Sequence, residues 1–197
     1  MSTTARRAGN PAKLALTPSQ TVGPYLSIGL TWPDGPEVAA PDAPGALVLS
    51  GRLIDGAGDT VPDGMLEIWQ ADAAGRFDSA EDPRGALATP GFRGYGRSLT
   101  DAGGRFWFRT VKPGALPDGE GGWQAPHVDV TVMARGLLDR LVTRVYFADE
   151  EEANAADPVL ASLPAAARDT LLARPTADGY ALDVVLQGPG ETAFFRL

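Results

Sequence analysis

The stretch HVDVTVMAR, residues 127–135, decides the fold class. Its apolar residues alternate with mostly polar ones, so that four of them share a face: Val128, Val130, Val132 and Ala134. Successive side chains of a β-strand point to opposite faces, whereas a helix brings apolar residues together every three or four positions. We therefore predict a strand with one face in the core and a more polar face that runs from His127 to Arg135.

Similar strand signals occur along the chain, separated by turns rich in Gly, Pro and Asp. The chain has 24 glycines and 17 prolines among 197 residues, well above the average usage of about 12% for the two together. Further strands are predicted over residues 46–55, 64–72, 105–109, 141–147, 180–188 and 192–197. About seven short strands joined by such turns predict an all-β fold, an antiparallel β-sandwich.

Helix signals are few and short. Asp149 can cap a helix that begins with the acidic residues after it, because carboxylates favour the positive end of a helix. Ser162 can cap a second helix, with Pro164 in its first turn and an end near Pro175. Between the strands, residues 73–96 are predicted to form a long ordered loop, of the kind that often carries function.

Composition and charge limit the possible partners. The formal net charge of −8 argues against nucleic acid or an anionic membrane surface. The chain has no cysteine, which excludes disulfides, thiolate metal sites and thiol nucleophiles. No apolar run approaches the roughly 18 residues of a membrane span, and the first residues lack the apolar stretch of a signal peptide. We expect a cytoplasmic protein with a flexible arm over residues 1–16 and a single domain over residues 17–197.

The only histidine, His127, shares a strand face with Asp129. Such a pair can be half of a metal site, a general-base pair or a structural hydrogen bond. Metals that bind imidazole normally take two or three histidines, and the hydrolase pattern G-x-S-x-G does not occur in the chain. From these residues alone, a structural histidine is favoured over a metal ligand.

Two further features leave a functional and a structural interpretation open. The segment TVGPY, residues 21–25, combines a hydroxyl group, a residue without Cβ and a proline with a fixed φ. This combination suits a rigid backbone that a ligand approaches closely, but an ordinary turn is the simpler explanation. Arg135 ends the polar face of the 127–135 strand and suits a carboxylate at a cleft rim, although a surface arginine is again the simpler explanation.

Several motifs occur in the order typical of one family: TPSQTVGPY, DGMLEIWQADAAGRF, RTVKPG, WQAPHVDVTVMARG and GPGETAFF. Over residues 17–197 the chain resembles the intradiol ring-cleavage dioxygenases, and among them the protocatechuate 3,4-dioxygenases. The resemblance implies a β-sandwich core, in agreement with the strand pattern. It also implies cleavage of protocatechuate (3,4-dihydroxybenzoate) with O2 to 3-carboxy-cis,cis-muconate at a non-haem Fe(III).

Within that family the chain is similar to the α kind of subunit rather than the iron-bearing β kind, which is implied to bind Fe(III) through two histidines and two tyrosines. Here His127 keeps the first histidine position, Asp129 replaces the second, and Leu116 and Arg84 stand where the tyrosines are expected. The resemblance thus implies no catalytic and no metal-binding residue in this chain. His127 is interpreted as a relic, held by Asp129 or a neighbouring group. The iron is expected on a homologous β subunit in an (αβ)n assembly.

The resemblance also gives a role to the two features left open above. In the α kind, the T-x-G-P stretch and the arginine of the A-R-G run are implied to lie near the substrate, at the interface with the β kind. They correspond to Thr21, Gly23, Pro24 and Arg135, which we expect to line the substrate pocket. A rigid backbone suits a pocket wall, and a guanidinium suits the carboxylate of an aromatic acid.

Two other functions are kept as alternatives. A non-enzymatic β-sandwich binding module of the transthyretin-like kind shares the turn-and-strand pattern, and it would leave Thr21 and Arg135 without a role in catalysis. A self-sufficient enzyme such as a catechol 1,2-dioxygenase would need iron ligands of its own. The residues at positions 84, 116 and 129 do not match such ligands.

Overall fold

The computed structural model describes residues 16–85 and 87–196. Within these residues the chain is mostly β, and its helices are only four to six residues long. The strands are β1 (Ala46–Ile54), β2 (Met65–Trp69), β3 (Tyr95–Leu99), β4 (Arg105–Val111), β5 (Leu116–Pro117), β6 (Trp123–Gln124), β7 (His127–Met133), β8 (Leu141–Phe147), β9 (Leu172–Pro175), β10 (Gly179–Ala181) and β11 (Val184–Val185). The helices are α1 (Tyr25–Gly29), α2 (Glu151–Ala156), α3 (Pro158–Ala161) and α4 (Ala165–Asp169). The prediction of a β protein with a few short helices is confirmed.

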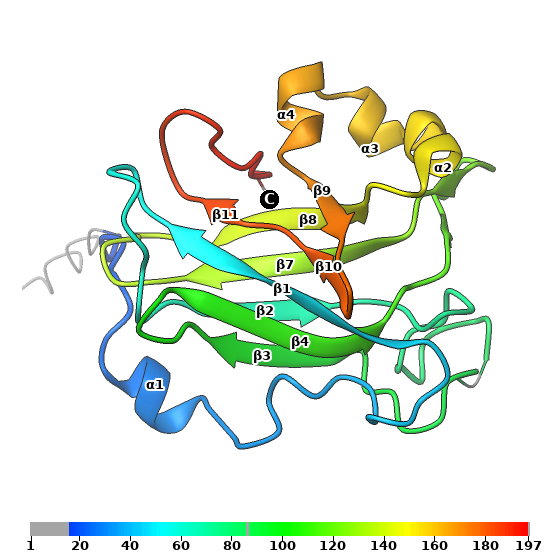
Figure 1. The fold of residues 1–197 in the computed structure, drawn as a ribbon, viewed down its shortest axis with the longest axis horizontal. Coiled ribbons are helices and arrows are strands. Elements are labelled where there is room, and N and C mark those ends of the chain that lie inside the picture. Colours follow the sequence, from blue (N-terminus) through cyan, green and yellow to red (C-terminus); the bar gives the residue numbers. More distant parts are fainter. Residues whose placement is uncertain (1–15, 86, 197) are drawn as a thin grey trace, which may run out of the picture.

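The predicted N-terminal arm, residues 1–16, falls outside the described residues except for Leu16, which is exposed. The first described helix, α1, lies at the margin of the molecule (Figure 1), and none of its residues is buried. No helix within residues 16–85 and 87–196 is long and apolar enough to cross a membrane.

Most of the strands form one large, curved sheet (Figure 1). The hydrogen-bonded order is β11–β1–β10–β9–β8–β7–β2–β3, and β4 pairs with β1 as well. A short turn at residues 100–104 brings β4 back beside β3, where the Trp107 amide donates a hydrogen bond to the Ser98 hydroxyl at 3.3 Å. The sheet thus nearly closes on itself like a barrel. β5 and β6 form a separate two-stranded sheet.

The predicted antiparallel arrangement is wrong in part, because the sheet is mixed. β10 and β11 both pair with β1 in parallel, and β9 pairs with β8 in parallel. Parallel neighbours need a crossover connection, and the helices α2, α3 and α4 supply one between β8 and β9. The alternation of apolar residues identifies a strand but not the direction of its neighbours.

A glycine in β1 allows the close contact between this strand and the segment that joins β10 to β11. A Cβ atom at Gly51 would lie 1.8 Å from the backbone oxygen of Leu182 and 2.8 Å from the ring of Phe106. No side chain fits in that space. The pairing around β1 therefore depends on a residue without a Cβ at position 51.

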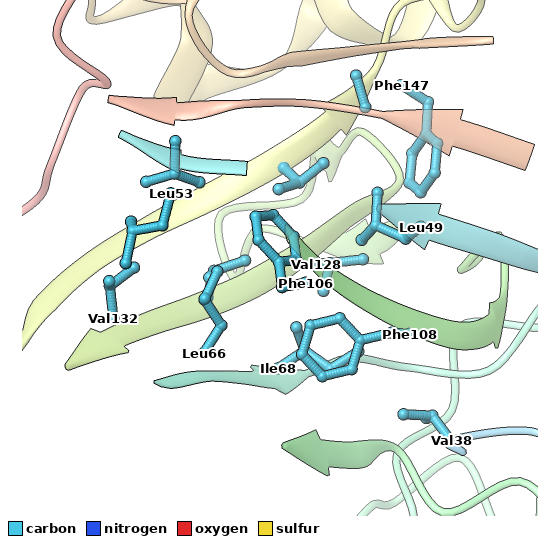
Figure 2. Packing of buried hydrophobic residues seen from close by; sticks show 14 of the residues in the cluster. Val38, Leu49, Leu53, Leu66, Ile68, Phe106, Phe108, Val128, Val132 and Phe147 are labelled. Carbon is cyan, nitrogen blue, oxygen red and sulfur yellow. The ribbon is translucent and has the colours of Figure 1, made fainter. Parts of the chain in front are cut away.

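The core fills the inside of the curved sheet. Figure 2 shows side chains from β1, β2, β4 and β7 that meet there: Leu49, Leu66, Phe106, Phe108 and Val128. The apolar face of β7 is buried as predicted, and Val128, Val130 and Val132 are at most 3% exposed. Burying a side chain of this size contributes roughly 1.5–3 kcal/mol relative to leaving it exposed. A slip of one residue would expose the whole face, so burial fixes the register of β7.

Both predicted helix caps are wrong. Asp149 does not cap α2, which begins two residues later. Its carboxylate instead accepts hydrogen bonds from Lys112 Nζ and from the Tyr180 hydroxyl, both at 2.8 Å. Ser162 ends α3 rather than beginning a helix, and Pro164 stands directly before α4. Asp149 is not a cap because it bonds to residues far away in the sequence. Ser162 is not a cap because it ends α3, a helix that was not predicted.

Two predictions about irregular segments have different outcomes. The strand predicted over residues 192–197 is wrong, because the described residues 192–196 contribute one isolated bridge, between Phe195 and Val142. The long loop predicted over residues 73–96 is present up to the start of β3. The buried carboxylate of Asp72 fixes it by accepting hydrogen bonds from four loop amides: Ala74, Arg76, Ala88 and Thr89. Burial disfavours the charged form of Asp72, but these bonds outweigh it and lower its pKa.

Candidate functional site

Three turns meet at one end of the sheet because of the register of β2, β3 and β7. Met65, the first residue of β2, lies opposite Leu99 of β3 and opposite Met133 of β7. The turn that enters β2 and the turns that leave β3 and β7 are therefore neighbours in space. This register brings Asp63 next to Arg135, although the two residues are far apart in the sequence.

A hollow of about 440 Å³ opens at this end of the sheet. The segment before α1 and α1 itself form one side, and the turns around β2, β3 and β7 form the other. The lining includes Gly23, Pro24, Leu26, Asp63, Leu99 and Arg135. Three of the four residues predicted for a substrate pocket thus line one hollow. The fourth, Thr21, bonds to the turn beside it.

Thr21 fastens the segment before α1 to the turn that leaves β7. Its hydroxyl oxygen accepts a hydrogen bond from the Gly136 amide at 2.8 Å and lies 3.4 Å from the Ala134 carbonyl oxygen. These two groups flank Arg135, so Thr21 holds the backbone that carries the arginine. Such a bond contributes about 1 kcal/mol net. The residue therefore has a structural role that its sequence motif did not indicate.

Gly23 and Pro24 form the entry to α1. Their carbonyl oxygens accept hydrogen bonds from the amides of Leu26 and Ile28, at 3.1 and 3.3 Å, and Pro24 has a φ of −62°. A Cβ atom placed on Gly23 would meet nothing within 4 Å. The chain's own described atoms therefore do not require glycine here. The open side leaves room for a group from outside the chain to approach the backbone.

Arg135 forms an ion pair with Asp63 at the rim of the hollow, through its Nε atom. The arginine side chain is 75% exposed and the aspartate side chain 41% exposed. Ion pairs in solvent contribute roughly 0–1 kcal/mol, so this pair matters little for stability. Asp63 was not among the predicted site residues. Its P-D-G context marks only a turn, and the strand register rather than a sequence motif places it beside Arg135.

The hollow combines an apolar interior with a charged rim. Leu26 and Leu99 supply apolar surface, and the Arg135–Asp63 pair supplies charge. Such a site suits a small molecule with a flat apolar part and one anionic group, which a guanidinium binds through two parallel hydrogen bonds. The arrangement can bind and orient a molecule of this kind.

The second region indicated by the sequence surrounds His127 in β7. The imidazole is buried, and its Nδ1 atom lies 2.7 Å from the Ala125 carbonyl oxygen. A carbonyl oxygen only accepts, so Nδ1 carries the proton in this bond. Burial, and then the charge of Arg144, lowers the pKa of His127. The histidine therefore stays neutral and forms part of the packed interior.

Asp129 is not the hydrogen-bond partner of His127, contrary to one of the two expectations. Its Oδ1 atom lies 4.0 Å from Nε2 of His127 but only 2.9 Å from Nε of Arg144 in β8. Arg144 also donates to the Gln124 side-chain oxygen at 2.8 Å and to the Tyr146 hydroxyl at 3.4 Å. Burial, against the charge of Arg144, raises the pKa of Tyr146 to about 12, so this phenol stays protonated.

The other two positions where the resemblance implies iron ligands, residues 116 and 84, also lack a metal donor. Leu116 is a buried apolar residue of β5. Arg84 donates two hydrogen bonds to the Asp82 carboxylate, at 2.8 and 2.7 Å, and its guanidinium lies over the ring of Phe77. In the described part of the chain, no three His, Asp or Glu side chains gather as a metal site requires. A leucine offers no ligand atom and the two arginines add positive charge, so these residues do not fit Fe(III).

Comparison with known proteins identifies the family. The model of a family described as Dioxygenase matches residues 35–188. The protocatechuate 3,4-dioxygenase alpha chain of Burkholderia cepacia is 47% identical in an alignment of 199 positions, which covers 92% of this chain and 98% of that one. The protocatechuate 3,4-dioxygenase beta chain of Burkholderia cepacia is 38% identical over 76% of this chain and 68% of that one.

A solved structure agrees with these matches. The dioxygenase domain of a dioxygenase carbohydrate-binding protein fusion from Streptomyces sp. SirexAA-E matches this chain with a TM-score of 0.58 and 29% identity. The match covers 90% of this chain and 99% of that one. Sequence, family match and fold therefore agree. This chain belongs to the intradiol dioxygenase family and, within it, is similar to the protocatechuate 3,4-dioxygenase alpha chains.

Proposed function

We propose that this chain is the α subunit of a protocatechuate 3,4-dioxygenase, in an (αβ)n assembly in the cytoplasm. A homologous β subunit holds a non-haem Fe(III), and Thr21, Gly23, Pro24 and Arg135 of this chain form part of the wall around protocatechuate. The ring is cleaved with O2 between its two hydroxylated carbons, which gives 3-carboxy-cis,cis-muconate.

One observation carries the proposal: four segments far apart in the sequence meet at one hollow. Gly23, Pro24 and Arg135 line it, and Thr21 bonds the first segment to the last. Its volume of about 440 Å³ lies in the range of roughly 300–1,000 Å³ that is usual for small-molecule sites. The apolar lining suits an aromatic ring, and the guanidinium suits the carboxylate of an aromatic acid.

The surface beside the hollow supports the presence of a partner subunit. α1 is five residues long, has no buried residue, and exposes Tyr25 and Ile28 by 78% and 72%. So short a helix is not stable alone in water, and clustered exposed apolar side chains are typical of an interface. α1 also precedes residues 35–188, the part that matches the wider family. We infer that the β subunit packs on α1 and closes the hollow from that side.

The donor chemistry supports placing the iron on the partner. In this chain Asp129 is paired with Arg144, and Leu116 and Arg84 stand at the other ligand positions. Bound by the β subunit, the iron would supply Lewis-acid activation of the ring. The part of this chain is to bind and orient the aromatic acid and to exclude water from the site.

The test uses the enzyme made by co-expression of this chain with a β chain that carries a complete ligand set. Arg135→Ala is expected to raise the KM for protocatechuate about tenfold or more, because a hydrogen bond to a charged group is lost. Thr21→Ala is expected to lower kcat/KM about twofold to tenfold, because the turn that carries Arg135 loses its fastening. The matched control is Arg140→Ala, an exposed arginine outside the hollow, which is expected to behave like the unmodified enzyme.

The opposite result has a definite meaning. If the chain does not co-purify with the β chain, the α-subunit proposal is wrong. If it does, and Arg135→Ala and Thr21→Ala both leave the steady-state constants unchanged, the pocket assignment is wrong. The binding-module alternative, in which these residues have no part in catalysis, would then be favoured.

A further inference from the structure

Two neighbouring turns form part of one side of the hollow, and each is fixed by a threonine hydroxyl. The turn before β2, residues 61–64, is held by Thr100, whose hydroxyl donates to the Val61 carbonyl at 2.7 Å and accepts from the Gly64 amide at 2.8 Å. Thr100 is buried, so solvent does not compete strongly for these bonds. The backbone that carries Asp63 is therefore set by the core of the sheet.

Packing fixes the same turn further. A Cβ atom at Gly64 would lie 2.4 Å from Cδ2 of Leu53, so this position accepts only glycine without rearrangement. Pro62 restricts φ on the other side of Asp63. Asp63 thus stands on a stiff support, with only its own side-chain torsions left to vary.

The turn after β7 is held in the same manner by Thr21, through the Gly136 amide. The backbone of this turn is fixed, but the Arg135 side chain is 75% exposed and is not held by packing. A solvent-exposed arginine gives up about 2 kcal/mol of rotamer entropy when one conformation is selected. The ion pair with Asp63 favours one conformation of the Arg135 side chain.

We propose that Asp63 is a positioning residue that holds the Arg135 guanidinium over the hollow in the orientation that receives the substrate carboxylate. The pair uses Nε of Arg135. The two terminal nitrogens, Nη1 and Nη2, then present the edge that forms two parallel hydrogen bonds with a second carboxylate. This inference rests on the proposed function, in which Arg135 faces an aromatic acid.

The charge of Asp63 also has an effect of the opposite sign. A carboxylate beside Arg135 reduces the positive potential that attracts an anionic substrate. If this repulsion dominated, removal of Asp63 would improve binding of the acid. If positioning dominates, as we propose, its removal weakens binding. The sign of the change in KM therefore separates the two effects.

The test uses the co-purified αβ enzyme with Asp63→Ala, Asp63→Asn, Arg135→Ala and the double variant Asp63→Ala/Arg135→Ala. Asp63→Ala is expected to raise the KM for protocatechuate about twofold to fivefold with kcat nearly unchanged, the size of an exposed ion pair. Asp63→Asn, which keeps an oxygen acceptor at this position without the charge, is expected to restore part of the loss. In the Arg135→Ala background, Asp63→Ala is expected to add nothing.

Two further measurements make the test specific. The inhibition constant of catechol, which lacks the carboxylate, is expected to change little in Asp63→Ala. Asp42→Ala, an exposed acid outside the hollow, is the matched control and is expected to leave KM unchanged. Iron content and thermal unfolding of each variant check that assembly and folding are intact.

Each outcome decides between the claims. If Arg135→Ala raises KM but Asp63→Ala leaves it unchanged or lowers it, the positioning role is wrong and the proposed function stands. If Asp63→Ala raises KM equally with and without Arg135, the aspartate does not act through the arginine. If Arg135→Ala itself has no effect, the proposed pocket is wrong and the inference is wrong with it.

Discussion

The carboxylate of Asp129 accepts a hydrogen bond from Nε of Arg144 at 2.9 Å, whereas Nε2 of His127 lies 4.0 Å from the same oxygen. Arg144 of the neighbouring strand β8 is thus the ion-pair partner of Asp129. The sequence had suggested His127 as the partner of this aspartate. The histidine bonds to the main chain instead, through the Ala125 carbonyl. The region indicated by the sequence is therefore a structural network.

Removing the cation of this network is expected to destabilise the chain. Arg144→Met leaves Asp129 and Gln124 without their shared donor in a half-buried place. We expect the free energy of unfolding to fall by about 1–3 kcal/mol, measured by urea denaturation. Arg105→Met, an exposed arginine of β4, is the control, with an expected change within about 0.5 kcal/mol. Equal stability of the two variants would contradict the role given to Arg144.

The stability of the chain is expected to depend on pH through His127. Burial and the charge of Arg144 lower its pKa in the folded chain, while the unfolded imidazole titrates near 6.5. As the pH falls through about 6.5, the unfolded chain takes up a proton that the folded chain does not bind. The free energy of unfolding should therefore decrease below that pH and level off once the pH is below the folded pKa.

Urea denaturation between about pH 7.5 and pH 5.5 measures this effect. In His127→Asn, whose amide nitrogen can replace Nδ1 as the donor to Ala125, the same step should be absent. Because the chain has a single histidine, no other imidazole contributes to the difference. Parallel pH profiles for the two proteins would show that His127 does not titrate as its burial requires.

The purified chain is expected to carry no iron without its partner. Leu116 and Arg84 offer no ligand atom for a ferric ion, and Asp129 is already neutralised by Arg144. Metal analysis of the chain expressed alone should find far less than one iron per polypeptide, and its visible absorption should be flat. The co-expressed αβ enzyme, prepared in the same way, is the control. Stoichiometric, tightly held iron in the single chain would favour a self-sufficient enzyme.

Strand positions could be predicted from the sequence for several strands that bury one face, although β3, which also buries alternate residues, was missed. β7 and β8 are found at their predicted places, because alternation persists along a half-buried strand. The parallel pairing of β1 with β10 and β11 could not be predicted, since alternation says nothing about neighbours. The helices α1 and α3 are too short for a helical period to show in the sequence.

The candidate site was only partly predictable for a related reason. Thr21, Gly23, Pro24 and Arg135 were expected from motifs. The last three line one hollow, and Thr21 bonds to the turn that carries Arg135. Asp63 was missed, because its place depends on the register between β2 and β7. Register belongs to a pair of strands, so the sequence of one strand alone does not determine it.

The pairing of β1 with the late strands has a consequence for synthesis of the protein. Within the described residues, the parallel partners of residues 48–54 lie among residues 179–185. During synthesis, the edge of β1 that pairs with β10 and β11 therefore stays unpaired until most of the chain has been translated. An open edge next to apolar side chains invites aggregation, so nascent chains should depend on chaperones until the late strands emerge.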